Sequence, residues 1–299
     1  KGELAGYYES IAAAMVPHLR GRPITMERYP AGIDHEGFIQ KDVSKGFPEW
    51  LKRVEVPKKG GTSWYPLVGD TRSLLWIANQ NCITPHVWVS HLPDLDKPDL
   101  CVFDLDPSRD DAAELRAATL EVRGLIEELG LVSWVKTSGS KGFHIVIPLD
   151  GEAAFDTVWE FGQTCGALLV KRNPARFTQQ FLKVDREGRI LVDTGRNGYG
   201  ATFAAVYAVR PKRGAPISAP CTWSEVESGA ATPQAFALRT MARRMDDVGD
   251  LWAKLHDRGQ SLNGALEKLR PLLTDEERSH ARGAARRKPA PKKSSPRSS

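Results

Sequence analysis

An apolar run that ends in two aspartates constrains the fold of this chain more than any other stretch. Residues 100–103 read LCVF, a pattern typical of a buried β-strand, and DLDP follows directly. Because side chains alternate between the faces of a strand, Asp104 and Asp106 share one face while Phe103 and Leu105 point into the core. Two like charges held this close require a cation. A simple turn is the competing interpretation, since Asp-Pro at a strand end often only redirects the chain.

A polar turn between two further strands follows downstream. Residues 132–136 and 143–149 have the apolar composition of strands, and TSGSKG connects them. This turn offers backbone N–H groups, hydroxyls and an ammonium to an anion, as phosphate-binding turns do. It is not a Walker A loop, because the spacing differs and a strand follows instead of a helix. An ordinary hairpin turn with a solvated lysine is the alternative. His144 lies on the second strand, and a lone histidine at such a position usually has a structural role.

A third apolar strand, residues 189–193, also ends in a carboxylate, Asp193. Three carboxylates at strand ends are able to hold two divalent ions about 3.5–4 Å apart, the arrangement used in phosphoryl transfer. Hard oxygen ligands favour Mg²⁺ or Mn²⁺. The alternative is that Asp193 only caps the turn that follows it.

The net positive charge is concentrated at the C-terminal end. Residues 281–299 carry seven basic residues and no acidic one, which leaves 35 basic against 37 acidic residues in the remainder. A Pro/Ser/Lys/Arg segment of this kind is predicted to be a disordered basic tail that adds salt-sensitive attraction to phosphates. The body, residues 1–280, is close to neutral, so any binding of nucleic acid there depends on local patches.

The four cysteines are widely spaced in apolar surroundings and form no CxxC pair, which predicts buried, reduced thiols and no structural zinc site. The sequence shows no apolar stretch of the roughly 18 residues that a membrane span needs, and no signal peptide. We therefore expect a soluble protein that does not bind membranes.

Helix and strand signals alternate along the chain. Helices are predicted over residues 8–19, 74–79, 111–129, 153–170, 246–256 and 262–272, with short strands between them. Asp111 and Glu114 form a candidate capping box, and Gly130 is a candidate stop signal. Strands separated by helices predict a mixed sheet with helices packed over it, an α/β (α+β) protein.

Taken together, the motifs resemble a known family. FDLDP, SGSKGFHIVIPLD and the run from Ile190 to Pro220 are similar to the three motifs of the archaeo-eukaryotic primase superfamily, and specifically of the polymerase domain of bacterial DNA ligase D and its stand-alone relatives. The resemblance extends from about Tyr7 to Trp223. It implies the primase-polymerase fold: an RRM-like catalytic sheet and a smaller N-terminal α/β subdomain around a cleft, within residues 1–280.

The resemblance also implies roles for individual residues. The catalytic metal ligands, for two Mn²⁺ or Mg²⁺ ions, would be Asp104, Asp106 and Asp193. The nucleotide-binding residues would be Ser138, Gly139, Ser140, Lys141 and His144, with His86, Arg186, Arg210 and Arg196 nearby. The DNA contacts would be Phe38, which packs against the template strand, Lys41 in the same motif, and Lys1, which matches a lysine that reads a downstream 5′-phosphate.

The implied function is template-dependent nucleotidyl transfer that extends primers in DNA repair, gap filling or non-homologous end joining, with use of ribonucleotides. The implied partners are DNA with gapped or broken ends, nucleoside triphosphates, a DNA ligase and an end-binding protein. A monomer in the bacterial cytoplasm, associated with the nucleoid, is expected.

Two other classes of function compete with this interpretation. The DxD pair also occurs in metal-dependent phosphatases and glycosyltransferases, and residues 104–108 satisfy the phosphatase pattern DxDx[ST]. A non-catalytic module that binds DNA ends or recruits a ligase is the second alternative, and the intact acidic triad disfavours it.

Overall fold

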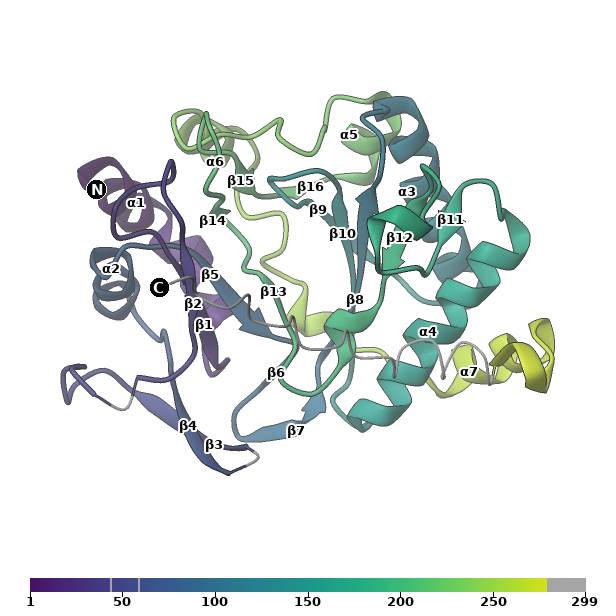
Figure 1. Cartoon of the computed structure of the whole chain (residues 1–299), viewed down its shortest axis with the longest axis horizontal. Helices are drawn as coiled ribbons and strands as arrows, with labels where there is room; N and C mark the ends of the chain where they lie inside the picture. The colour runs from purple at the N-terminus through teal and green to yellow at the C-terminus, as the bar shows by residue number, and fades with distance from the viewer. Residues whose placement is uncertain (44, 59, 279–299) are drawn as a thin grey trace, which may run out of the picture.

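The structure is a computed structural model that describes residues 1–278 apart from 44 and 59. Its centre is a six-stranded sheet with the strand order β11-β12-β8-β10-β9-β16, in which only β11 and β12 run parallel (Figure 1). The strands are β8 (Leu100–Pro107), β9 (Trp134–Thr137), β10 (Phe143–Pro148), β11 (Phe177–Thr178), β12 (Ile190–Asp193) and β16 (Pro220–Cys221). This is the mixed sheet that the sequence predicts.

Three helices cover one face of this sheet, namely α3 (Ala112–Glu128), α4 (Phe155–Arg172) and α7 (Asn263–Leu269). The N-terminus of α3 forms where predicted, because the Asp111 carboxylate accepts a hydrogen bond of 2.9 Å from the Glu114 N–H. Only that half of the capping box is present, since the Glu114 carboxylate pairs with Arg176 instead. Gly130, in the left-handed region at φ +84°, follows the helix end.

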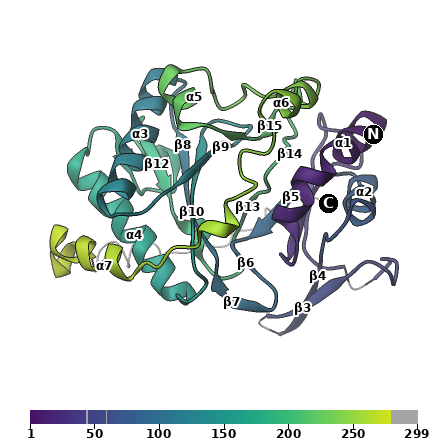
Figure 2. The same cartoon turned by 180° about the vertical axis from the view of Figure 1, so that it is seen from behind.

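A four-stranded antiparallel sheet with the order β13-β5-β1-β2 forms the second subdomain. Its strands are β1 (Ile24–Arg28), β2 (Phe38–Gln40), β5 (Cys82–Trp88) and β13 (Thr202–Ala204). Helices α1 (Gly2–Leu19) and α2 (Thr71–Asn79) pack against each other beside β5, on the opposite side of the molecule from α3 and α4 (Figure 2). Helix α1 begins earlier than predicted. The prediction missed its first turn because those residues are mostly exposed and show no apolar periodicity.

Short elements connect the two sheets and complete the C-terminal part. Three strand pairs are β3 (Arg53–Lys58) with β4 (Gly61–Pro66), β6 (Ser90–His91) with β7 (Asp94–Pro98), and β14 (Ala208–Val209) with β15 (Ile217–Ser218). The remaining helices are α5 (Trp223–Ser228) and α6 (Met241–Val248), and 3₁₀ turns cover Lys183–Asp185, Gly195–Asn197, His256–Arg258 and Arg270–Leu272.

The prediction of a helix over residues 246–256 is wrong. Helix α6 starts at Met241 and stops at Val248, because Gly249 adopts a positive φ of +65° that ends the helix. The predicted helix over 262–272 is shorter than expected. It is α7 followed by a 3₁₀ turn in which Pro271 cannot donate the next helical hydrogen bond.

The alternation of side chains along β8 divides its residues between two cores. Phe103 and Leu105 are fully buried with α3 and α4, as predicted, whereas Val102 joins the core shared with the N-terminal subdomain. Val146 on β10 does the same. The side chains of Asp104 and Asp106 therefore stand on the face that is not covered by helices.

All four cysteines are buried and unpaired. Within the described residues, none of the helices combines the length and apolar composition needed to cross a bilayer. The predicted basic tail, residues 281–299, lies outside the described part of the chain.

Candidate active site

Four polar side chains form one row across the six-stranded sheet. Asp193 on β12 is the cross-strand partner of Asp104 on β8. His144 on β10 faces Asp104 from the other side, and Lys136 on β9 is the partner of His144. Because opposed residues on neighbouring strands point to the same face, the whole row stands on the helix-free face. Asp106 is two residues beyond Asp104 and shares that face.

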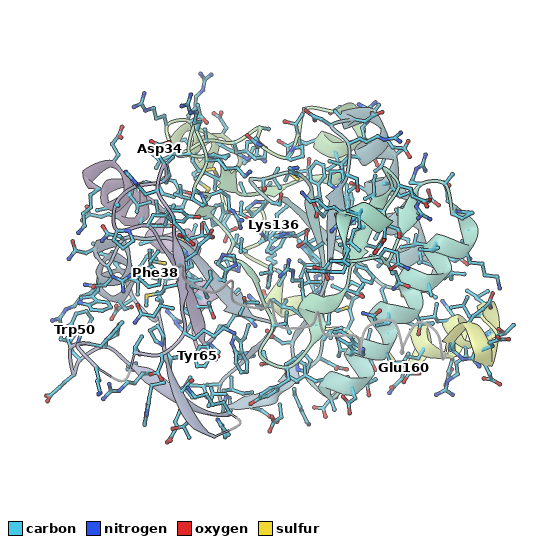
Figure 3. All side chains as sticks on the ribbon, viewed as in Figure 1. Asp34, Phe38, Trp50, Tyr65, Lys136 and Glu160 are labelled. Atoms are coloured by element: carbon cyan, nitrogen blue, oxygen red, sulfur yellow. The ribbon has the colours of Figure 1, made fainter. Side chains whose placement is uncertain are left out.

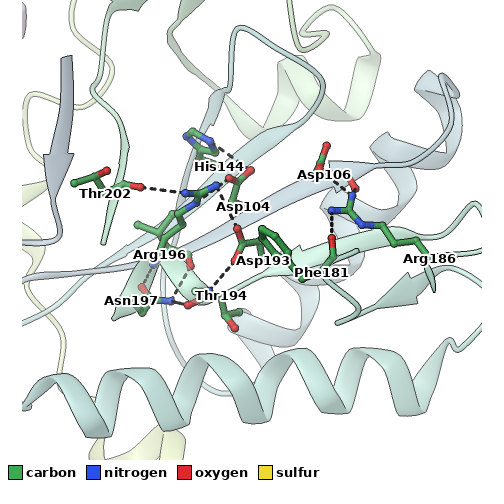
Figure 4. A network of polar contacts seen from close by, with 12 residues as sticks. Asp104, Asp106, His144, Phe181, Arg186, Asp193, Thr194, Arg196, Asn197 and Thr202 are labelled. Carbon is green, nitrogen blue, oxygen red and sulfur yellow. Dashed lines mark hydrogen bonds and ion pairs between the residues drawn. The ribbon is translucent and has the colours of Figure 1, made fainter. Parts of the chain in front are cut away.

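An arginine bridges the two opposed carboxylates (Figure 4). Arg196 lies in the turn after β12, with Nε 3.2 Å from Oδ2 of Asp104 and Nη2 3.3 Å from Oδ2 of Asp193. The Gly195 N–H donates to the other oxygen of Asp193 at 2.8 Å. Like charges that are directly opposed on adjacent strands destabilise a sheet, so Arg196 supplies the cation that this pair requires.

Asp106 is turned toward a second arginine. Arg186 Nη1 lies 2.8 Å from Oδ2 of Asp106, and the nearly buried guanidinium also donates to the carbonyls of Phe181 and Gln180 (Figure 4). The structure thus brings Asp104 and Asp193 together on one arginine and places Asp106 on another. Sequence reasoning assigned Arg186 and Arg196 to the nucleotide, whereas here both contact the acidic residues.

Burial and charge act in opposite directions on the two opposed carboxyl groups. Burial works to raise the pKa of Asp104, but contacts with His144 and Arg196 outweigh it and keep this pKa below its ordinary value. For Asp193 burial prevails, assisted by the charge of Asp104, and the pKa is raised. Burial lowers the pKa of His144 to about 4, with a contribution from Lys136. His144 is therefore neutral at neutral pH, and Arg196 carries the charge that compensates Asp104.

The donor set suits hard divalent ions. Across residues 1–278, leaving out 44 and 59, His, Cys, Asp and Glu side chains do not form a preassembled cluster of three or more metal ligands. Instead, the guanidinium groups of Arg196 and Arg186 contact one carboxylate oxygen of each of the three aspartates. Carboxylate oxygens on one face of two adjacent strands are ligands that Mg²⁺ and Mn²⁺ prefer. The two arginines are the groups that such ions would replace.

The turn from Ser138 to Gly142 closes one end of the site. The Ser138 Oγ accepts hydrogen bonds from the N–H groups of Ser140 and Gly142, both at 3.1 Å, so these donors stabilise the turn and do not face a ligand. Gly142 approaches β8 so closely that a Cβ there would lie 1.6 Å from the Leu105 carbonyl oxygen. Only glycine fits this position, and it sets the turn directly against the strand end that carries Asp106.

A cavity of about 520 Å³ contains most of the predicted site residues. Its polar lining comprises His86, Asp104, Asp106, Ser138, Ser140, Lys141, His144, Lys183, Arg186, Asp193, Arg196 and Arg210. Two buried nitrogens in this lining, Nδ1 of His144 and Nε of Arg210, have no hydrogen-bond partner within the described part of the chain. Buried polar atoms are almost always paired, so both indicate that the cavity receives a polar ligand.

The predicted DNA contacts lie away from the cavity. Phe38 on β2 is 46% exposed, and the Arg28 guanidinium lies 5.2 Å from its ring centroid. Lys41 lines a separate groove of about 520 Å³ between β2 and the β3–β4 hairpin. Lys1 is exposed at the start of α1. Gly139, with φ +64°, shapes the turn but does not line the cavity.

Sequence reasoning missed three residues at this site. Lys136 is fully buried, donates to the Ser218 hydroxyl and lies 5.4 Å from the ring centroid of Phe203 (Figure 3). A lone lysine in an apolar strand was the available signal. Phe203 on β13 lines the cavity and packs edge-on against His144. Glu27 contacts His86 through a hydrogen bond of 3.0 Å, and the sequence carries no signal for this contact.

Comparison with known proteins agrees with the geometry. A model of the LigD primase-polymerase domain family matches residues 1–252. The chain is 34% identical over 260 residues to the multifunctional non-homologous end joining protein LigD of Mycolicibacterium smegmatis. This alignment covers 85% of this chain and 34% of that protein. It is 32% identical over 274 residues to the LigD protein of Pseudomonas aeruginosa, in an alignment that covers 90% of this chain and 32% of that protein. The chain thus spans about a third of the length of these relatives.

A solved structure matches at the level of the fold. The polymerase domain of Mycobacterium tuberculosis ligase D, in complex with DNA, superimposes with a TM-score of 0.80 at 30% sequence identity, covering 86% of this chain and 92% of that one. These matches support the polymerase interpretation and not the phosphatase, glycosyltransferase or non-catalytic alternatives. The chain belongs to the family of LigD primase-polymerase domains, which are nucleotidyltransferases.

Proposed function

We propose that this chain extends a primer on a template strand by nucleotidyl transfer, with Asp104, Asp106 and Asp193 as the catalytic residues. The observation that carries the proposal is the placement of three carboxylates on one face of β8 and β12, at the floor of a cavity whose rim is basic. Transfer to a primer hydroxyl requires an acidic site for cations beside a cationic site for a triphosphate. Both are present within one cavity.

Polymerases of this family generally use divalent metals, and we propose that the ions here are Mn²⁺ or Mg²⁺ in a two-ion site on the three aspartates. When bound, such ions lower the pKa of the attacking hydroxyl and neutralise charge on the triphosphate. The protein contributes position and electrostatics: the rigid pairing of β8 with β12 fixes Asp104 relative to Asp193 before any substrate arrives.

The triphosphate of the incoming nucleotide is proposed to lie against the 138–142 turn. Lys141 supplies an ammonium, Ser138 a hydroxyl, and Arg210 a guanidinium whose Nε is buried and unpartnered in the described residues. His144 lines the same cavity, and its Nδ1 is buried without a hydrogen-bond partner among the described residues. Arg186 and Arg196, which contact the aspartates here, would be available to join this group when the carboxylates hold cations.

The DNA is proposed to cross the four-stranded sheet. Phe38 offers an exposed aromatic ring for stacking with a template base (Figure 3). Lys41 lines the adjoining groove, where it is able to contact phosphate. Lys1 is a candidate for a downstream 5′-phosphate. Since the curated relatives are end-joining proteins, we propose that the substrates are gapped or broken DNA ends, with a DNA ligase and an end-binding protein as partners and ribonucleotides among the nucleotides used.

The test is primer extension on gapped DNA with labelled nucleotides, with Mn²⁺, with Mg²⁺ and with EDTA. We expect extension that needs a template and a metal, and that is lost in the Asp104→Ala variant. Asp94→Ala removes an exposed carboxylate on β7, outside the cavity, and serves as the matched control. Phosphate release without primer growth, or unchanged extension by Asp104→Ala, would contradict the proposal.

A further inference from the structure

A histidine in the cavity lining, on the four-stranded sheet, is in direct contact with a carboxylate that does not itself line the cavity. His86 on β5 lines the cavity, and Glu27 on the neighbouring strand β1 places Oε2 3.0 Å from the Nε2 of His86. The hydroxyl of Tyr29 donates to the other oxygen of Glu27 at 3.1 Å. With both carboxylate oxygens engaged, Glu27 holds a defined orientation, and the imidazole is fixed through one of its two nitrogens.

The charges around this pair decide its protonation. Burial works to raise the pKa of Glu27, but the contacts with His86 and Arg210 prevail and lower it to about 2, so the carboxylate is ionised. Burial and the positive charges of Arg210 and Arg196 lower the pKa of His86, against the effect of Glu27. A neutral imidazole beside an ionised carboxylate must carry its proton on the nitrogen that faces the carboxylate. That nitrogen is Nε2.

We propose that Glu27 is a positioning residue that holds His86 as the Nε2–H tautomer, so that Nδ1 accepts a hydrogen bond from a sugar hydroxyl of the incoming nucleotide. The inference rests on the proposed function and deepens it. No side chain or backbone group among the described residues bonds to Nδ1 of His86, so this nitrogen is left for a ligand in the cavity.

The lone pair on Nδ1 of His86 favours a hydroxyl group as its partner over a phosphate. A neutral nitrogen acceptor repels phosphate oxygens, which are acceptors themselves, and attracts an O–H donor. The cationic and hydroxyl groups proposed for the phosphates, Lys141 and Ser138, come from the six-stranded sheet. His86 stands on the four-stranded sheet beside Ala204 of β13. A nucleotide whose triphosphate rests on the turn would therefore present its sugar to His86.

The tautomer is read directly by ¹⁵N NMR of the imidazole rings in the full chain, with the His86 resonance assigned through His86→Gln. We expect Nε2 to be protonated in the unmodified protein and both tautomers to be populated in Glu27→Ala. Glu27→Gln keeps an oxygen that accepts from Nε2–H, so it should preserve the wild-type pattern. An Nδ1–H tautomer, or a doubly protonated ring at neutral pH, would overturn the proposal.

Binding measurements in the absence of DNA distinguish the contribution of the sugar to nucleotide affinity from that of the phosphates. By calorimetry in Mg²⁺ buffer, Glu27→Ala should weaken the binding of a ribonucleoside triphosphate by about tenfold, the equivalent of one hydrogen bond. The affinity for inorganic tripolyphosphate should not change. Glu27→Gln should stay within about threefold of the unmodified protein. Glu9→Gln, on the exposed face of α1, is the matched control, and thermal melts verify that each variant is folded.

The outcomes distinguish this inference from the proposed function. If the unmodified protein binds nucleotide with the expected tautomer but does not extend primers, the polymerase assignment fails and the role of Glu27 stands. If it extends primers while Glu27→Ala leaves the ring shifts and nucleotide affinity unchanged, the role of Glu27 fails. Equal weakening of nucleotide and tripolyphosphate binding by Glu27→Ala would mean that His86 contacts phosphate, which also overturns the inference.

Discussion

His144 stands directly opposite Asp104 on the neighbouring antiparallel strand, with its Nε2 3.5 Å from Oδ1 of that carboxylate. Because burial lowers the pKa of His144 to about 4, the imidazole orients Asp104 at neutral pH without cancelling its charge. The compensating charge comes from Arg196, which is anchored in a turn and not on the sheet. An exchangeable cation on a rigid pair of carboxylates is what a metal-dependent site requires.

The two opposed aspartates should differ in their effect on stability. Ionisation of Asp193 is disfavoured in the folded protein, since its pKa is raised, so Asp193→Asn should leave the melting temperature equal or higher. Asp104→Asn removes a carboxylate whose ionised form is favoured in the folded protein, so this variant should have a lower melting temperature. Both variants should lose primer extension by at least about 100-fold. The check is to measure melting temperatures in EDTA and primer extension for both variants. A large loss of stability in Asp193→Asn would contradict the electrostatic account.

Arg196 should compete with metal ions for the aspartates. Arg196→Ala leaves Asp104 and Asp193 opposed without a cation, so the melting temperature in EDTA should fall. The affinity for Mn²⁺, measured by titration without nucleotide, should rise by roughly threefold to tenfold because the competitor is gone. Arg243→Ala, at a position that is 89% exposed on α6, is the matched control. Weaker Mn²⁺ binding by Arg196→Ala would show that the arginine supports the ion instead of competing with it.

Gly142 and Gly124 should respond oppositely to alanine. A Cβ on Gly142 would collide with the Leu105 carbonyl, so Gly142→Ala must separate β8 from the turn and should lower the free energy of unfolding by several kcal/mol, with loss of activity. Gly124 lies within α3 with open space around it. Gly124→Ala should therefore stabilise the protein by about 0.5–1 kcal/mol through helix propensity. The free energies of unfolding of both variants are measured by denaturant titration, and equal effects would contradict the tight contact between Gly142 and β8.

His256 should make stability depend on pH far from the active site. Burial and the charge of Arg22 lower the pKa of His256 from 6.5 to about 4, although Asp99 lies 3.7 Å away. Between these two pH values the unfolded chain binds a proton that the folded chain does not, so stability rises with pH across this window and is lost as the pH falls. His256→Asn should flatten this part of the profile. Melting temperatures from pH 7 to pH 4 are the measurement, and an unchanged slope would exclude His256 as a source.

Much of the site could be predicted from local patterns. The alternation in FDLDP placed Asp104 and Asp106 on one face, and the structure confirms the opposite face as core, because a strand has a fixed period of two. The start of α3 at Asp111 and the turn at Ser138–Gly142 were likewise readable, since a helix cap and a glycine turn depend on residues within a few positions of each other. The helix expected over 246–256 failed because its apolar spacing continues past Gly249, whose positive φ ends it.

Local patterns in the chain identify the residues at strand ends and turns, and therefore the carboxylates and the lysine that are available for chemistry. Their partners follow from the packing of the folded chain: Arg196 with Asp104 and Asp193, Arg186 with Asp106, and Glu27 with His86. Apart from the contact of Arg196 with Asp193, which are three residues apart, these contacts join segments far apart in the chain, across strands whose lateral order no local period encodes. The charge state of a buried side chain depends on such neighbours and on the loss of water around it, so it emerges only when the two sheets have packed together.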